Sequence, residues 1–395
     1  MKKTIRYILT GALTAALVFG FAACGSDDDD DDKSDSTKNS DQLPADSSTN
    51  GSGDTGNGGG TESSVQLPAS SGTNELSGSS FTATSDHKGK PNTIKYSFGD
   101  SSLTFVQTET EAATEYYDAF DEKITLTGSY TYDSALKVLY LVETGAKMTY
   151  ERNGKLLYTE VQSPATFAAY KQNKLDMMKA VAKDASVVTD DKFVSFFGED
   201  VYDDFKHFGY TDTTGATAVS DEIYAKWLTY QKKEDAAESA EIDIKCYSLD
   251  GTTLKMTTLE AAYPSGTKFA KIFSSYSIET YLTSGNTERL KVSTHTRTGE
   301  KGEIKLTDVE YKILSATDDK VTLAPITGKD ADDLYGIYNE AQKSDVALTY
   351  TDGMDKTTVS FTIGETAYSF DINYITAAVV TAALSDADSY TKVTE

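Results

Sequence analysis

Hydrophobic and polar residues alternate along much of the chain from residue 74 onward, with the period of two that is typical of half-buried strands. Clear examples are residues 93–98 and 102–106, and the apolar run 138–142 is a further strand signal. Short polar links separate such segments, and one of them carries Asn153-Gly154, a pair that favours a tight hairpin turn. Because parallel strands need long crossovers, these short links predict antiparallel pairing.

A helical period replaces this alternation between residues 164 and 240. Ser163 followed by Pro164 is typical of a helix start, and Ser220 has the character of a second N-cap. At 100° per residue, the first helix gathers its large apolar residues on one side. They are Phe167, Tyr170, Leu175, Met178 and Val181.

The predicted fold class is mainly β (α+β), with antiparallel meander sheets or small barrels. Strand alternation returns at residue 242, so the helical segment separates two β units. We expect a first β domain over 74–163, a helical segment over 164–240 and a second β domain over 241–395. The second domain should include a short helix near residues 330–342.

The first 23 residues have the layout of an export signal. Lys2, Lys3 and Arg6 precede residues 8–21, which carry no charge. This apolar run is shorter than the roughly 20 residues that a membrane span needs, and it suits the apolar core of a secretory signal. An uncleaved anchor and a plain secretory signal are the alternatives.

The end of this segment resembles the lipobox of bacterial lipoproteins. Ala22, Ala23 and Cys24 match the two small residues and the cysteine of that motif, whereas Phe21 stands where leucine is usual. The resemblance implies cleavage before Cys24, diacylglycerol on its sulfur and a further acyl chain such as palmitate on its amino group. It thereby implies a lipid bilayer as the first partner. Each buried methylene contributes about 0.8 kcal/mol, so several chains hold a protein firmly.

The segment 24–73 continues as a linker that is rich in Ser, Gly, Thr, Asn and Asp and has no aromatic residue. Such a composition predicts a disordered tether. Its acidic run, residues 27–32, resembles the surface-export signal of lipoproteins in some Gram-negative bacteria. That resemblance implies display on the cell surface from the outer membrane. A position on the periplasmic face, with the run acting as a solvated spacer or holding divalent cations loosely, is the alternative.

The start of the first β domain resembles the opening of lipocalin-like bacterial domains. Leu76, Gly78 and Phe81 carry this resemblance, with Phe81 one residue beyond the usual tryptophan position. It implies small β-barrels, which often enclose a ligand cavity.

Composition narrows the partners and the chemistry. The net charge of −25 disfavours binding to nucleic acid. With Cys24 acylated, Cys246 is the only thiol left, so no internal disulfide can form, and its alternating surroundings predict a buried position. The three histidines lie far apart, and no zinc spacing, phosphate loop or nucleophile motif is present. We therefore assign no catalytic, cofactor or metal residue.

Tyrosine is abundant, with 25 residues, and suits sugar or protein recognition. Tyr116 and Tyr117, expected to be exposed, and Trp227 are the candidate ligand-binding residues. The predicted function is a non-catalytic binding or adhesion module for a host protein, a glycan or a small hydrophobic ligand. A structural envelope lipoprotein without a ligand and a glycoside-type hydrolase with paired carboxylates are the alternatives.

Overall fold

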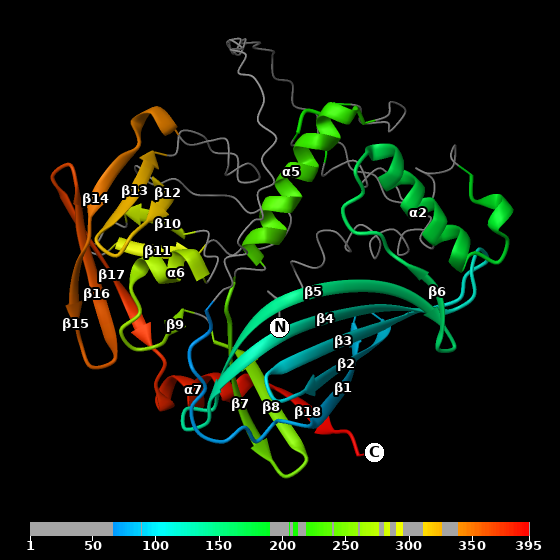
Figure 1. The fold of residues 1–395 in the computed structure, drawn as a ribbon, viewed down its shortest axis with the longest axis horizontal. Helices are drawn as coiled ribbons and strands as arrows, with labels where there is room; N and C mark the ends of the chain where they lie inside the picture. The colour runs from blue at the N-terminus through cyan, green and yellow to red at the C-terminus, as the bar shows by residue number, and fades with distance from the viewer. Residues whose placement is uncertain are drawn as a thin grey trace, which may run out of the picture.

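The computed structural model describes residues 66–87, 89–189, 205, 208–211, 219–238, 241–259, 261–275, 280–284, 290–294, 311–325 and 339–394. Cys24 and the remainder of residues 1–65 lie outside the described residues. The mainly β, antiparallel architecture predicted from the alternation is confirmed (Figure 1).

The largest sheet has nine strands, eight of which close into an antiparallel barrel because β4 also pairs with β5. Around the barrel they are β1 (Ser79–His87), β2 (Lys90–Phe98), β3 (Ser102–Glu111), β4 (Phe120–Asp133), β5 (Val138–Arg152), β7 (Asp243–Asp250), β8 (Thr253–Thr258) and β18 (Asp388–Lys392). The ninth strand, β6 (Lys155–Thr159), pairs with the far end of β5 across the predicted hairpin. Asn153 and Gly154 both have positive φ there, which confirms the tight turn.

The barrel is closed at one end and splayed at the other. Pairing between β1 and β18 covers Phe81 and Thr82, and β5 pairs with β7 along Val138–Leu141. Past this closed section, β4 and β5 continue as a curved ribbon that reaches β6 (Figure 1). Aromatic and aliphatic side chains fill the closed section, for example Tyr96, which lies 5.0 Å from Phe105 between ring centroids.

Two barrel strands come from the segment that we expected to begin the second β domain. β7 and β8 pair with each other, with β5 and with β18, so residues 243–258 complete the first barrel. The alternation in the sequence identifies these strands but does not specify their partners, because pairing across long sequence separations is set by packing.

The helical segment covers the splayed end of the barrel (Figure 1). Helix α2 (Phe167–Val181) begins after the N-cap Thr166, whose hydroxyl accepts a hydrogen bond from the Ala169 amide; the predicted Ser163 cap therefore lies too early. The five residues predicted for its apolar side are all buried. Helix α5 (Asp221–Glu238) begins as predicted, with the Ser220 hydroxyl accepting from the Ile223 amide at 3.3 Å. A 3-10 turn, η1 (Ala185–Val187), follows α2.

The second β unit has two further sheets. The five-stranded sheet has the order β11 (Leu290–Thr294), β10 (Thr280–Ser284), β12 (Tyr311–Ala316), β13 (Lys320–Pro325) and β14 (Ser344–Ala347). The four-stranded sheet has the order β15 (Thr349–Asp352), β16 (Lys356–Ile363), β17 (Thr366–Tyr374) and β9 (Ala262–Tyr263), with β9 parallel to β17. Helices α6 (Phe269–Ser275) and α7 (Ala377–Ala383), with the turns η4 (Glu340–Gln342) and η5 (Leu384–Asp386), complete the unit. Most of the short helix predicted over 330–342 lies outside the described residues.

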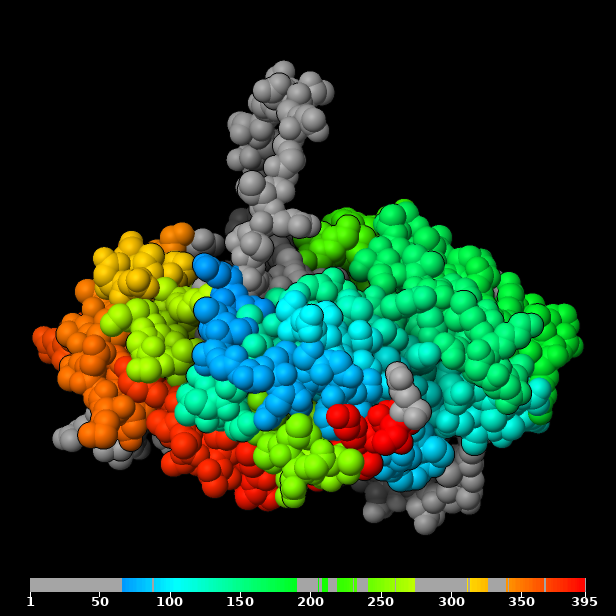
Figure 2. All heavy atoms as spheres, turned by 60° about the horizontal axis from the view of Figure 1, so that its bottom comes forward, coloured from blue at the N-terminus to red at the C-terminus, as the bar shows by residue number. Residues whose placement is uncertain are grey.

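The second unit packs on the outer face of β5 and β7. Val138 and Tyr140 of β5, with Ile244 and Cys246 of β7, share one apolar core with the second unit. In Figure 2 the yellow-to-red unit therefore lies beside the blue and cyan barrel strands, and the green helical segment lies on the opposite side.

Candidate binding site at the open end of the barrel

Strands β2, β3 and β4 all become polar on their concave side at the splayed end of the barrel. Asn92 on β2 lies opposite Glu109 on β3, and Glu109 lies opposite Glu122 on β4. Directly opposite residues project to the same face of a sheet, and Asn92 and Glu122 are in phase with the inward apolar residues of their strands. A polar row therefore follows the apolar rows of the closed section.

A single lysine, Lys90 on β2, contacts two carboxylates of β3. Lys90 Nζ donates to Glu111 and lies 3.4 Å from Glu109 Oε1. Burial, the largest single influence, lowers the pKa of Lys90, but the neighbouring Glu111 and Glu109 together raise it above its usual value. Lys90 is therefore firmly protonated and engaged with β3.

Glu122 is the unusual group of this row. Its exposed fraction is 6%, and that of Asn92 is 5%. Among the described residues, neither Glu122 Oε1 nor Asn92 Oδ1 has a hydrogen-bond partner. Burial, followed by the negative charge of Glu111, raises the pKa of Glu122 to about 8. The carboxyl group is therefore mostly neutral at pH 7.

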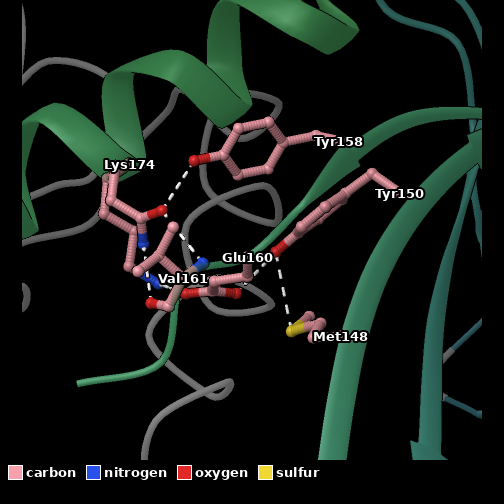
Figure 3. A network of polar contacts seen from close by, with 7 residues as sticks. Met148, Tyr150, Tyr158, Glu160, Val161 and Lys174 are labelled. Atoms are coloured by element: carbon pink, nitrogen blue, oxygen red, sulfur yellow. Dashed lines mark hydrogen bonds and ion pairs between the residues drawn. The ribbon is translucent and has the colours of Figure 1, made fainter. Parts of the chain in front are cut away.

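The polar row continues through β5 to helix α2. Tyr150 lies opposite Glu122, and its hydroxyl donates to Glu160 Oε2 at 3.3 Å. Glu160 Oε1 in turn accepts from Lys174 Nζ at 2.6 Å, in an ion pair with side-chain exposures of 9% and 2%. Figure 3 shows the contacts of Tyr150, Glu160 and Lys174. Beside them, the Tyr158 hydroxyl donates a hydrogen bond to Asn173 Oδ1 at 2.6 Å. The helical segment is thus bonded to the sheet by buried polar contacts beside the candidate site.

The residues that the sequence predicted for ligand binding are not brought together. Trp227 is buried between aromatic rings of the helical core, 5.2 Å from both Phe205 and Tyr224. Tyr117 was expected to be exposed but is also buried, because its bridge to Ala182 at the end of α2 turns the ring into this core. Tyr116 alone of the three is exposed, at 48%.

Other chemistry in the described part of the chain is limited. Cys246 is buried as predicted, and burial raises the pKa of its thiol to about 11, so the thiol stays protonated. Within the described ranges, no three His, Cys, Asp or Glu side chains are arranged to hold a metal ion. None of the described helices is both long and apolar enough to cross a bilayer.

The sequence interpretation missed the polar row, although its signal is visible. In the stretch 120–126, Phe120, Ile124 and Leu126 occupy alternate positions, and Glu122 falls at the same phase as these apolar residues. A charged residue at an inward position is uncommon, because burial disfavours the ionised form.

Comparison of the chain with protein-family models, with curated proteins and with solved structures found no match. The inferences that follow therefore depend on the residues and the geometry of this chain.

Proposed function

We propose that this protein is a membrane-anchored, non-catalytic binding lipoprotein of the bacterial outer membrane, displayed at the cell surface. Its binding site would be the polar row at the open end of the barrel, beneath the helical segment. The lipobox-like residues around Cys24 and the acidic run 27–32 support the location. The tether-like composition of 24–73 would let the folded part stand away from the bilayer.

One observation carries the binding role: two buried acceptor atoms in one row, Asn92 Oδ1 and Glu122 Oε1, have no partner among the described residues. A buried polar group without a partner costs about 1–3 kcal/mol, so most such groups in folded proteins are bonded. Apolar side chains would stabilise this position better in a purely structural protein. A ligand with hydrogen-bond donors would supply the missing partners.

A second candidate, a glycoside-type hydrolase, is favoured by the division of roles among the carboxyl groups. Burial, and after it the charge of Glu111, keeps Glu122 mostly neutral at pH 7, so Glu122 could donate a proton while Glu111 is the second carboxylate. Against this role, Glu111 is bonded to Lys90, and both glutamates are deeply buried. If the parent protein releases nitrophenol from a panel of nitrophenyl glycosides and Glu122→Gln does not, hydrolysis would be favoured over binding.

The proposal is tested with the full chain expressed in a Gram-negative host. We expect acyl mass on Cys24, release from the membrane fraction on Cys24→Ser, and loss of the protein when intact cells are treated with protease. Mass spectrometry of the gently purified protein should detect a small molecule that Glu122→Gln loses. Protein without acyl mass, or protected from protease until the cells are lysed, would contradict the location. A ligand-free protein that also binds no member of a small-metabolite panel would contradict the binding role.

A further inference from the structure

We infer that the site at the open end of the barrel takes a small organic cation, an alkylammonium or guanidinium compound, with its N–H groups directed at Glu122 and Asn92. This inference rests on the proposed binding function and specifies its ligand class.

The first argument is the excess of acceptors. Among the described residues, both atoms of this row that lack a partner, Glu122 Oε1 and Asn92 Oδ1, are acceptors once Glu122 gives up its proton. The amide nitrogen of Asn92 is already directed at Ser85 Oγ, 3.5 Å away, so the carbonyl oxygen is the end of this amide that still needs a donor. An ammonium group has only donors, which is the complement of this arrangement.

The second argument is the distribution of charge. Each lysine near the row already has a carboxylate of its own: Lys90 has Glu111, and Lys174 has Glu160. Among the residues that the structure describes, Glu122 has no such cation, although it lies in the same row as Glu109 and opposite Tyr150. A bound cation would pair with Glu122 as Lys90 and Lys174 pair with their own carboxylates. A bound anion would instead add negative charge to a site that already has more carboxylates than lysines.

The third argument concerns size. One row deeper, Ile94, Gln107 and Ile124 lie side by side, and the next row brings the tightly packed Tyr96 and Phe105. These side chains fill the interior beneath the row, so the inferred ligand is small and carries a short apolar tail rather than a long chain. Lys90 and Glu109 are the more exposed members of the row, with side-chain exposures of 23% and 14%, so access is expected from their side.

Binding of a cation should be linked to release of a proton. Glu122 is faced by Lys90 from β2, by Glu109 and Glu111 from β3, by Tyr150 from β5, and more distantly by Glu160, which pairs with Lys174 of α2. Because the pKa of Glu122 lies near 8, a cation that binds at pH 7 displaces the proton of this carboxyl group. Affinity should therefore rise about tenfold from pH 6 to pH 7 and about fivefold from pH 7 to pH 8.

The experiment compares three probes of one shape and different charge: butylammonium, 1-butanol and butyrate. The full chain, purified in detergent, is titrated with each probe by calorimetry in two buffers of different ionisation enthalpy. We expect butylammonium to bind at least tenfold more tightly than 1-butanol, with release of up to one proton, and butyrate not to bind. Glu122→Gln should remove this preference, and Asn92→Leu should weaken it.

Asp118→Asn is the matched control, because it also replaces an acidic side chain with its amide, but at a side chain that is 60% exposed. It should leave butylammonium binding unchanged. Equal binding of butylammonium and 1-butanol, or equal loss in Asp118→Asn and Glu122→Gln, would overturn the cation assignment while leaving a binding role intact. Failure of all three probes together with a wider metabolite panel would overturn the binding function itself. Both results are independent of acylation at Cys24.

Discussion

The ionisation of Glu122 should make the stability of the protein depend on pH in a direction opposite to that of most carboxylates. The pKa of Glu122 is raised from 4.5 to about 8, first by burial and second by the charge of Glu111. Below pH 4.5 the carboxyl group is neutral in the folded and unfolded states alike. Between pH 4.5 and about 8 the unfolded chain ionises while the folded chain holds its proton, so the folded state loses relative stability as pH rises. Above about pH 8 both states are ionised, and the loss is complete.

The magnitude follows from linkage. Each unit of pKa difference corresponds to 1.36 kcal/mol, so the contribution of Glu122 should fall by about 4 kcal/mol between pH 5 and pH 8. Glu122→Gln keeps the shape and removes the titration. The variant should therefore match the parent near pH 5 and exceed its free energy of unfolding by up to about 4 kcal/mol at pH 8.

Urea unfolding followed by the fluorescence of Trp227, which lies in the adjoining helical core, would measure this difference at half-unit steps of pH. Asp118→Asn should run parallel to the parent throughout, because its side chain is solvated. Parallel curves for the parent and Glu122→Gln from pH 5 to pH 8 would show that Glu122 is ionised in the folded protein, and the reasoning would then be wrong.

Three further predictions concern the helical segment and the barrel wall. Lys174→Met should lower the free energy of unfolding by about 3–5 kcal/mol, because Glu160 would stay buried without its cation. Urea unfolding measures this loss, and the double variant with Glu160→Leu should recover most of it. Trp227→Ala should lower the free energy of unfolding by about 3–5 kcal/mol, because it leaves a cavity among the aromatic rings. The same assay should detect little change in Tyr116→Ala. Equal effects of the two substitutions would contradict the difference in their burial. Cys246 should react with a thiol reagent such as dithiobisnitrobenzoate only after unfolding, and rapid labelling of the folded protein would contradict its burial.

Much of the secondary structure could be predicted because its signals are local. The alternation in 93–98 and the Asn153-Gly154 turn identify strands and a hairpin within a few residues. The apolar side of α2 likewise follows from its period. The start of α2 was less predictable, because Ser163 and Thr166 both have capping side chains, and the positive φ of Ser163 decides the choice.

Barrel closure and the site could not be predicted in the same way. Closure depends on the pairing of β18 with β1 and of β7 with β5, and period-two patterns do not distinguish one such partner from another. The polar row arises only when Asn92, Glu109 and Glu122 come into register on three strands. Tyr117 and Trp227 were interpreted from their chemical type alone, whereas their burial depends on helices that lie far along the chain.

The order of the barrel strands along the chain has a consequence for how the chain folds during synthesis. β1 can pair with its neighbour β18 only after about 300 further residues have been synthesised. Contacts between residues so far apart in sequence slow folding. Until β18 arrives, β1 and β8 each present an unpaired strand edge to other chains. If the chain crosses a membrane from its amino-terminal end, this delay would keep the barrel unfolded while the chain passes through. The same delay would lengthen the time during which unpaired strands can aggregate. A chaperone that shields strand edges would be most useful to this protein in that interval.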